Sequence, residues 1–400
     1  MNIILFDDPT IRQNLLPLTF TRPVAEIRIG ILTIAEKWRR HMGVTASYLT
    51  QPYLQQKYTL HMASNNIYVN GAVCPDDALV NEILDLKLGE ALYQQGTLIA
   101  LNGDSLNLNE VELLLNYSPV GSRETSNCTL IKDVWEIFSL NGKQIRADFN
   151  LITDGRTSQP ITDKYTAVYG EENIFIEEGA SIKAAVLNAE DGPIYIGKNA
   201  QVQEGSLIKG PFALCEGSHV NMGAKMRGDI TVGPYSKVGG EISNSVIFGY
   251  TNKGHDGFLG NSVIGEWCNL GADTNNSNLK NNYAAVKLWN YAKGGFKNTG
   301  LQFCGLIMGD HSKCGINTMF NTGTVVGVSA NIFGSGFPRN FVPSFSWGGA
   351  SGFETFQLRK AYEVAEKVME RRSKPFDETE QAILAYVFEQ TQQYRVWDKV

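Results

Sequence analysis

The chain has 400 residues, of which 35 are Lys or Arg and 41 are Asp or Glu, so its formal net charge is −6. Hydrophobic residues make up 43% and charged residues 19%, which allows a sizeable core and argues against disorder. Mild acidity without a basic block argues against a nucleic-acid partner, and the lack of a run of about 18 apolar residues argues against a membrane span. At about 150 residues per domain, two or three domains are expected.

The opening residues Met1–Asp8 lack the basic region and long apolar stretch of a signal peptide, and we expect them to contain a first strand. The six cysteines include no CxxC pair and have no histidine cluster beside them, so neither a zinc ribbon nor a disulfide scaffold is predicted. Together these features favour a reduced, cytoplasmic protein.

The first 110 residues alternate between short apolar runs and segments with helical spacing. This alternation predicts an α/β domain built on a parallel sheet. Residues 120–165 give a weaker pattern, in which a helix over 131–139 connects this domain to the rest of the chain, so the first domain is expected over 1–165. The expected strands are 2–6, 44–49 and 66–69, and the expected helices are 29–41 and 78–87.

A six-residue period begins near residue 174. One aliphatic side chain per short flat side, with small residues at the corners, is typical of a left-handed parallel β-helix of hexapeptide repeats, which we expect over 170–337. Eight hits in register make a chance alternation a poor explanation. They are Ile196, Val202, Ile208, Leu214, Val220, Met226, Val232 and Val238.

Two stretches break the period, and an exit segment follows the last repeat. Residues 249–257 and 275–303 read as excursions from the coil, and loops on a rigid scaffold often carry chemistry. Residues 338–400 form a third region, with two amphipathic helices expected over 353–372 and 377–393 that cap the coil or its neighbours.

His255 is the main candidate for chemistry, because it lies in the first break between Gly254 and Gly257. An unperturbed imidazole has the pKa that a general base for an amine needs near neutral pH. Several asparagines follow, and their amides can fix a sugar or a carbonyl oxygen without adding charge. The alternative is that His255 binds the backbone and that the asparagines fill left-handed corners.

The segments Glu241–Val246 and His255–Thr274 resemble the acetyltransferase half of GlmU-like bifunctional sugar-1-phosphate nucleotidylyltransferase/amino-sugar-1-phosphate acetyltransferases. The family pattern runs roughly H-x-x-[YF]-[LI]-G-[DN]-x-x-[IV]-G-x-x-x-N-[IFL]-G-A-G-T, and the resemblance is specific over about 235–335. It implies a homotrimer, acetyl-CoA bound between neighbouring coils, and acetylation of the amine of a glucosamine-1-phosphate-like sugar.

The resemblance also assigns roles to positions. His255 matches the base that deprotonates the amine, Asn278 the residue that positions the acetyl group, and Asn269 a residue of the sugar site. Phe258 stands where many members have Tyr. The substrate-binding residues expected in this way are Asn269, Asn278, Glu241, Lys253, Lys287 and Phe258, and the expected acetyl-CoA-binding residues are Gly271, Ala272 and Gly315.

Two phosphate-binding cations of the family are missing. The expected Arg is Leu214, and the Lys expected two residues after Glu241 is Ser243. Their loss weakens the binding of a dianionic phosphate unless other cations replace them. Lys253, Lys225 and Arg227 are the candidates, although most such residues on a coil are simply solvated.

The front of the chain resembles sugar-nucleotide pyrophosphorylases, whose domain is Rossmann-like, over residues 16–30. Those enzymes place a glycine-rich loop before this stretch, whose amides cradle nucleotide phosphates. Here Asp7–Arg12 stands in its place without a glycine. The expected nucleotide-binding residues are Arg12, Arg22, Arg28, Asn70 and Gly71.

The metal site of that family is altered as well. The Asp that would bind Mg²⁺ after Asn70-Gly71 is Ala72, which has no ligand oxygen. A Mg²⁺ site would need one of four other carboxylates, so the metal ligands stay unassigned. These are Asp7, Asp8, Asp76 and Asp104.

Two functions remain open on the sequence alone. The first is an acetyltransferase whose front half makes a nucleotide sugar from a sugar phosphate and a nucleoside triphosphate. The second is a non-catalytic trimeric regulator or scaffold that binds nucleotide sugars. For the front half, an active transferase, a binding domain without transfer and a purely structural domain all stay possible, and Arg22 and Arg28 could be ordinary ion-pair partners.

Overall fold

The computed structural model describes residues 2–103, 108–125 and 128–398, and the chain divides into two compact units. The first unit comprises the residues up to Leu15, together with Thr21–Ile27 and Leu32–Asp133. The second comprises Leu16–Phe20, Arg28–Ile31 and Val134–Val400. The helices α5 (Val134–Ser139) and α6 (Asn141–Thr153), which the sequence grouped with the first domain, therefore fall in the second unit.

The first unit is built on a six-stranded sheet of order β2-β1-β3-β6-β5-β7. The strands β1, β2 and β3 pair in parallel, as expected, and β5 and β7 also pair in parallel. Only β6 among the six strands of this sheet runs the other way, antiparallel to β3 and to β5, with which it forms a hairpin that the sequence did not predict. A separate pair joins β4 (Val73–Cys74) to β8 (Thr129–Leu130). The sheet strands are β1 (Asn2–Phe6), β2 (Ser47–Leu49), β3 (Asn66–Asn70), β5 (Glu90–Gln94), β6 (Thr97–Asn102) and β7 (Gly121–Glu124).

The helices of the first unit are α1 (Pro9–Asn14), α2 (Ile34–Met42), α3 (Asp77–Leu84) and α4 (Val111–Leu115). The sequence predicted a helix from residue 29, but α2 begins only at Ile34. The reason is a capping box, in which the Thr33 hydroxyl accepts from the Glu36 backbone and the Glu36 carboxylate accepts from Thr33. The left-handed Gly43, at φ 67°, ends the helix.

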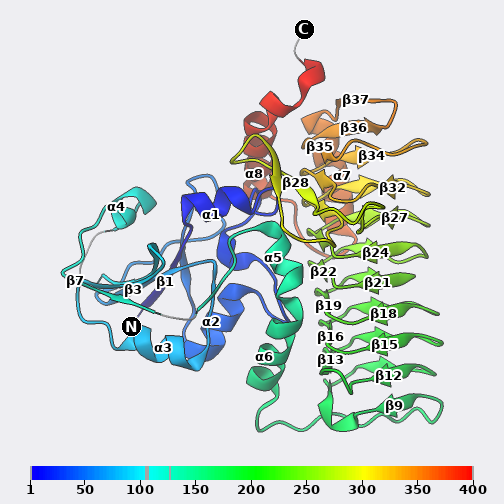
Figure 1. The fold of residues 1–400 in the computed structure, drawn as a ribbon, viewed down its shortest axis with the longest axis horizontal. Coiled ribbons are helices and arrows are strands. Elements are labelled where there is room, and N and C mark those ends of the chain that lie inside the picture. The colour runs from blue at the N-terminus through cyan, green and yellow to red at the C-terminus, as the bar shows by residue number, and fades with distance from the viewer. Residues whose placement is uncertain (1, 104–107, 126–127, 399–400) are drawn as a thin grey trace. The chain divides into compact units, whose positions relative to one another are not determined.

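The second unit is a coil of stacked short parallel strands with three faces, seen edge-on in Figure 1. Face 1 contains β10 (Ile174–Ile176), β13 (Ile194–Ile196), β16 (Phe212–Leu214), β19 (Ile230–Val232), β22 (Val246–Ile247), β25 (Val263–Ile264), β30 (Ile307–Met308), β33 (Val325–Val326) and β35 (Phe341–Val342).

Face 2 contains β11 (Ser181–Ile182), β14 (Gln201–Val202), β17 (His219–Val220), β20 (Lys237–Val238), β23 (Asn252–Lys253), β26 (Asn269–Leu270), β31 (Lys313–Cys314), β34 (Asn331–Ile332), β36 (Ser346–Gly349) and the antiparallel β37 (Gly352–Thr355). Face 3 contains β9 (Ala167–Tyr169), β12 (Val186–Asn188), β15 (Leu207–Lys209), β18 (Lys225–Arg227), β21 (Glu241–Ser243) and β24 (Phe258–Gly260). A short pair, β27 (Asn275–Asn276) with β32 (Met319–Phe320), lies further along the chain.

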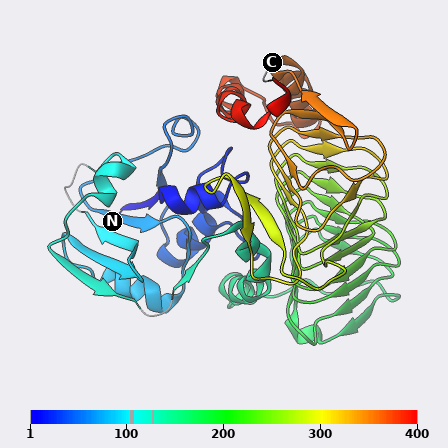
Figure 2. The same cartoon turned by 45° about the horizontal axis from the view of Figure 1, so that its top comes forward.

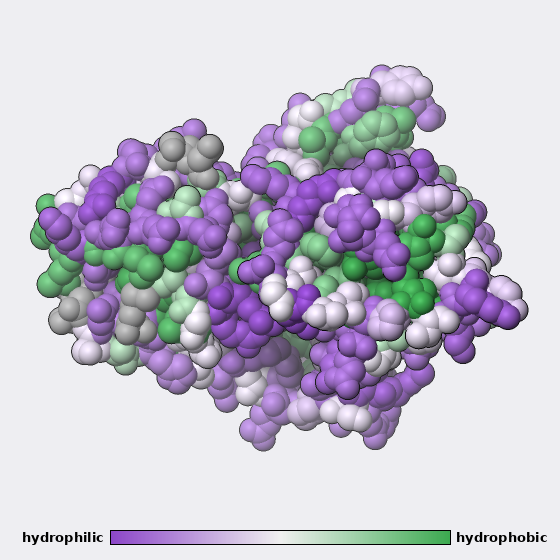
Figure 3. All heavy atoms as spheres, turned by 90° about the horizontal axis from the view of Figure 1, so that it is seen from below, coloured by the Kyte–Doolittle hydropathy of each residue, from purple (hydrophilic) through white to green (hydrophobic). Residues whose placement is uncertain are grey.

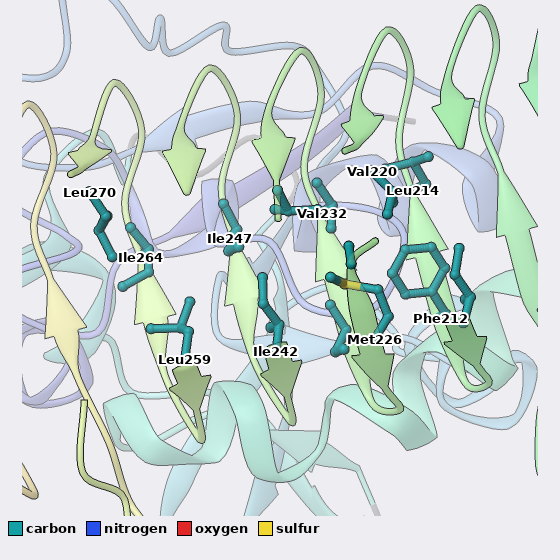
Figure 4. Close-up of a cluster of buried hydrophobic side chains, with 14 of the residues drawn as sticks. Phe212, Leu214, Val220, Met226, Val232, Ile242, Ile247, Leu259, Ile264 and Leu270 are labelled. Atoms are coloured by element: carbon teal, nitrogen blue, oxygen red, sulfur yellow. The ribbon is translucent and has the colours of Figure 1, made fainter. Parts of the chain in front are cut away.

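The core of the coil is the column of inward side chains that the six-residue period predicted. Figure 4 shows these residues, from Phe212 and Leu214 to Ile264 and Leu270, stacked turn upon turn inside the coil. From β13 onward most of the short strands contribute an almost fully buried side chain, and similar neighbours lie above and below it. The hexapeptide β-helix is therefore confirmed.

Three details of the coil differ from the sequence-based expectation. Residues 249–257 are not an excursion, because β23 continues face 2 within them. In the second break, β27 pairs with β32, and the true excursion is a hairpin of β28 (Lys287–Asn290) and β29 (Gly295–Asn298), which appears in yellow in Figure 2. The stacking also passes residue 337, since β35 and β36 pair with the coil.

Helices flank the coil within the second unit. Helix α6 contacts β16 and β19, and the Asn141 amide donates to the Asp229 carbonyl at 3.0 Å. The two expected C-terminal helices are present as α7 (Leu358–Glu370) and α8 (Glu378–Gln390), which pack on each other. Among the described residues, no helix combines the length and apolarity of a membrane span. Hydrophilic residues cover most of the face in Figure 3, and hydrophobic ones form separate patches.

Candidate active site

His255 lies on the turn that joins face 2 to face 3 of the coil, between β23 and β24, and its side chain is exposed. Glycines make this corner possible, because the neighbouring turns approach it too closely for side chains. A Cβ on Gly239 would lie 2.5 Å from the Gly254 oxygen, and one on Gly257, which has φ +113°, would lie 2.2 Å from the Thr274 oxygen. The His255 turn is therefore packed closely between the backbones of the preceding and the following turn of the coil.

Four successive carbonyls of this turn accept hydrogen bonds from the coil. The Asn221 amide donates to Gly254 at 2.7 Å, and the Glu241 backbone donates to Gly257 at 3.1 Å. Lys253 Nζ donates to His255 at 2.5 Å and to Asp256 at 3.0 Å, and Asp256 also accepts from the Asp273 backbone. Hydrogen bonds thus hold all four carbonyls of the turn, whereas the imidazole of His255 is exposed.

Lys253 occupies an inward position of the coil, one that aliphatic residues fill in the neighbouring turns. Its side chain is only 1% exposed, and it pairs in register with Val238. Burial lowers the pKa of Lys253 to about 8, although nearby Asp256 opposes the shift. This corrects the expectation that Lys253 contacts substrate, because its ammonium group faces the interior.

The outward residues of face 2 form a polar ladder beside His255, with one residue per turn. The register pairs His219 with Lys237, then Asn252, Asn269 and Lys313. Parallel strands lie about 4.8 Å apart, so Lys237 and Lys313, three steps apart, are separated by roughly 14 Å. This ladder is the floor of a groove.

The end of α7 supplies the opposite side of that groove through Val368, Arg371 and Arg372. The groove has a volume of about 970 Å³ and is lined by His255, Asn269, Gly271 and Ala272 of the expected site. Arg372 reaches across it and donates to the Asn252 side chain at 3.4 Å. A histidine, an amide and several cations therefore share one cavity.

Charge is concentrated in the groove. Lys237, Lys313, Arg371 and Arg372 line it, and this set of cations was not expected from the sequence. Burial lowers the pKa of His219, and the positive charges of Lys237 and Arg372 lower it further. The repeat register could have indicated the two lysines, since each directly precedes an inward residue, but nothing in the sequence placed α7 beside them.

An aromatic ladder adjoins the groove at the next corner of the coil. Tyr235, Tyr250, Trp267 and His311 all have left-handed backbone angles near +60°. The Tyr250 and Trp267 rings stack at 4.2 Å between centroids, and both residues line the groove. The Lys374 ammonium lies 6.0 Å from the centroid of Tyr250. Stacking thus gives this part of the groove wall a rigid, flat lining.

Other expected site residues lie on face 3, around the corner from the groove. Glu241 pairs in register with Phe258, and a Cβ built on Gly260 would touch both the Phe258 ring and the Asn278 amide. The Glu241 carboxylate binds Arg227 at 2.8 Å. Single-chain geometry therefore places the expected site residues on two faces.

Lys287 and Gly315 have separate positions. Lys287 is exposed at the start of the β28–β29 hairpin, where it pairs with Asn298. Gly315 lies directly against Gly271 on the next turn, and a Cβ on Gly271 would be 2.4 Å from the Gly315 carbonyl carbon. The two glycines let the backbones of successive turns meet beside the groove.

In the first unit, Asn70 and Gly71 serve the local backbone. The Asn70 amide donates to Leu98 at 3.0 Å and accepts from Ala72, and the Gly71 backbone donates to the Phe6 carbonyl at 2.8 Å. Arg12 is nearly buried and donates to the Tyr53 hydroxyl at 2.6 Å.

The two other expected arginines are also largely buried. Arg22 is 5% exposed, and Arg28, which belongs to the second unit, donates to the Ile31 carbonyl. Three of the five expected nucleotide-binding residues, Arg28, Asn70 and Gly71, are thus engaged with backbone.

The described carboxylates of the first unit do not fit a Mg²⁺ site. Asp7 is 1% exposed and accepts from the Val24 backbone and the Thr50 hydroxyl, and burial raises its pKa. Asp8 and Asp76 cap the first turns of α1 and α3. Asp104 lies outside the described residues, and among those described no three potential metal ligands cluster. With no ligand oxygen at Ala72, these residues do not fit a Mg²⁺ ion.

Comparison with known proteins identifies relatives of the chain. Residues 3–157 match a family described as sugar nucleotidyl transferase. The bifunctional protein GlmU of Methanocaldococcus jannaschii is 36% identical over 87 residues, which cover 22% of this chain and 21% of that protein. A bifunctional sugar-1-phosphate nucleotidylyltransferase/acetyltransferase of Sulfurisphaera tokodaii is 29% identical over 160 residues, covering 40% of this chain and 37% of that one. The matches thus span well under half of these relatives.

Solved structures with some likeness include hexapeptide and acyl transferases. A hexapeptide transferase family protein of Anaplasma phagocytophilum gives a TM-score of 0.25 at 12% identity, covering 56% of this chain and 92% of that one. A UDP-N-acetylglucosamine acyltransferase of Francisella novicida gives 0.26 at 10% identity, covering 57% and 90%. At these TM-scores the likeness says nothing about function.

Three observations agree on the same family resemblance. They are the motifs in both halves of the chain, the β-helix of the second unit and the match of residues 3–157 to the sugar nucleotidyl transferase family. The chain resembles the GlmU-like bifunctional sugar-1-phosphate nucleotidylyltransferase/acetyltransferases.

Proposed function

We propose that the second unit transfers an acetyl group from acetyl-CoA to the amine of an amino-sugar-1-phosphate, with His255 as the general base. The observation that carries this proposal is the exposed imidazole on a rigid turn at the edge of a 970 Å³ groove that also contains four cations. A thioester donor with phosphate groups needs such a combination of a base and positive charge.

The proposed acetyl transfer uses the groove positions of His255 and Asn269. As the amine nitrogen attacks the thioester carbonyl, His255 accepts its proton, and collapse of the tetrahedral adduct breaks the carbon–sulfur bond. The proton then passes to the departing thiolate, so atoms and charge balance. The exposed Asn269 amide lies in the same groove and can donate to the developing oxyanion.

A homotrimer is part of this proposal. Glu241, Phe258 and Asn278 lie on face 3, whereas the groove lies on face 2. A second copy that presents its face 3 beside the groove would unite the two sets in one site. The sugar phosphate would then be bound by residues of two subunits.

The experiment is thiol release from acetyl-CoA in the presence of glucosamine-1-phosphate. Substituting the base should lower kcat by about 10²- to 10⁴-fold, which is the usual contribution of a general base. His61→Ala is the matched control, because it removes an exposed imidazole of the first unit. Release that is unaffected by His255→Ala removes this histidine from the mechanism, and no release with any amino sugar favours a scaffold.

For the first unit, we propose sugar-1-phosphate nucleotidylyl transfer, supported by the family match over residues 3–157. A second candidate is nucleotide-sugar binding without transfer, which Ala72 and the engaged Asp7 favour because neither offers Mg²⁺ a free oxygen. Incubation with UTP, Mg²⁺ and N-acetylglucosamine-1-phosphate separates the two. Pyrophosphate release supports transfer, whereas silence with all the common nucleotides supports binding alone.

A further inference from the structure

We propose that Lys253 is a positioning residue that holds the His255 turn from inside the coil, so that the imidazole faces the groove. The kinetic part of this proposal rests on the proposed acetyl transfer. The structural part, that the Lys253 ammonium group fixes the backbone of the turn, stands on the hydrogen bonds alone.

The position of Lys253 is exceptional within its column. Val238 precedes it in register on face 2, Leu270 holds the equivalent place in the next strand, and both are buried aliphatic residues. A buried ammonium is costly unless hydrogen bonds compensate it, and an aliphatic residue would fill the place without that cost. The lysine therefore needs a reason beyond packing.

Its hydrogen bonds supply that reason. Lys253 Nζ lies 2.5 Å from the His255 carbonyl oxygen, 3.0 Å from that of Asp256 and 3.4 Å from that of Gly239. The first is the carbonyl of the proposed base itself. One ammonium thus ties the turn to its own strand and to the turn below.

The rest of the turn is anchored by other groups, so the contribution of Lys253 can be isolated. Asn221 binds the Gly254 carbonyl and the Glu241 backbone binds that of Gly257. Both ends remain fixed when Lys253 is replaced, and the middle, His255–Asp256, loses its donor from the interior. A displacement of about 1 Å at a catalytic group can lower the rate about 100-fold.

The test is Lys253→Met, which keeps the length of the side chain and removes the donor. We expect kcat for acetyl transfer to fall about 10- to 100-fold, with the KM for acetyl-CoA unchanged within about twofold. The melting temperature should not fall, because Met packs as the other inward residues do. Leu214→Met, at an inward position of the same core and outside the groove, is the control for altered packing.

A second variant and a second readout keep the proposal testable if acetyl transfer is absent. Lys253→Gln retains a donor on a shorter side chain and should recover part of the lost kcat. Hydrogen–deuterium exchange of the amides in residues 254–258 should be faster in Lys253→Met than in wild type or Leu214→Met, whether or not the protein is an acetyltransferase.

The outcomes separate the two proposals. If the wild type shows no acetyl transfer but amide exchange is faster in Lys253→Met, the proposed function is overturned and the positioning role is supported. Wild-type kcat and wild-type exchange in Lys253→Met overturn the positioning role, as does an equal loss in Leu214→Met. A raised KM with an unchanged kcat in Lys253→Met would mean that Lys253 contributes to substrate binding, and it would also overturn the positioning role.

Discussion

At the scale of single residues, Lys253 and His255 belong to the same turn of the coil but lie on opposite sides of it. The Lys253 ammonium group donates to the backbone of the turn from inside, and the His255 imidazole is exposed. The glycines around His255 were visible in the sequence, and close backbone contacts explain them. Lys253 was expected to contact substrate as a replacement for the missing phosphate-binding cations, and a charged residue normally lies outside a core. The six-residue count breaks before it, since the inward residues run Val232, Val238, Ile242, Ile247 and then Lys253. A lysine at an inward step carries no sequence signal that distinguishes it from a solvated one.

Lys253 makes protein stability depend on pH. Its pKa falls from 10.5 to about 8 on folding, so the unfolded chain binds more protons between these values and stability rises with pH across that window. At about 1.4 kcal/mol per pKa unit, the rise is about 3 kcal/mol. The carboxylates of Asp256 and Asp273 and the Cys314 thiol are the groups that oppose the shift.

The measurement is the free energy of unfolding of wild type minus that of Lys253→Met between pH 7.5 and pH 10.5. Subtraction cancels other groups that titrate in this range. The difference should move in favour of wild type by up to about 3 kcal/mol as pH rises. A difference that stays constant with pH would show that Lys253 keeps its ordinary pKa.

At the scale of elements, the coil was predictable because each strand obeys a short local rule, one inward aliphatic per side. The same rule misread residues 249–257, where the inward residue is charged. The helix α7 was predicted as an amphipathic segment, and its packing face contains Ala361, Ala365 and Met369. What the pattern could not show is which surface its far end meets, because that contact joins Arg372 to Asn252 across 120 residues.

The groove wall formed by α7 should contribute to binding of the acyl donor. Arg371→Ala combined with Arg372→Ala should raise the KM for acetyl-CoA about 10-fold. Charge-assisted hydrogen bonds to phosphate contribute about 1.5–3 kcal/mol to binding, and less when they are exposed to solvent. The kcat should change little, since neither arginine lies on the His255 turn. Steady-state kinetics at low ionic strength measure the KM for acetyl-CoA and kcat.

Arg359→Ala is the control on the same helix, because Arg359 is exposed and pairs with Glu363 one turn away. It should leave both constants at the wild-type values. If the double variant also has the wild-type KM, the α7 wall has no part in donor binding.

At the scale of the whole molecule, composition and repeat pattern were enough for an α/β unit followed by a β-helix and terminal helices. The placement of α5 and α6 was missed, because their contacts to β16, β19 and β25 are long-range and leave no local pattern. The β5–β6 hairpin of the first unit was missed for a different reason. Its strands, Glu90–Gln94 and Thr97–Asn102, follow a helix without the crossover that a parallel sheet would need.

The proposed assembly is a homotrimer, because groove residues and face 3 residues lie on different sides of one coil. Light scattering coupled to size-exclusion chromatography should give three times the monomer mass at micromolar concentration. A monomer that nevertheless turns over acetyl-CoA would refute the two-subunit site. The same experiment on His255→Ala should still give a trimer, since the imidazole is exposed in the single chain.

The most direct test of acetyl transfer at the groove is mass spectrometry of glucosamine-1-phosphate after incubation with isotope-labelled acetyl-CoA, comparing wild type, His255→Ala and His61→Ala. We expect a labelled N-acetylated sugar phosphate with wild type and His61→Ala, and at least about 100-fold slower product formation with His255→Ala. Equal product formation by all three proteins would contradict a role of His255 as the general base.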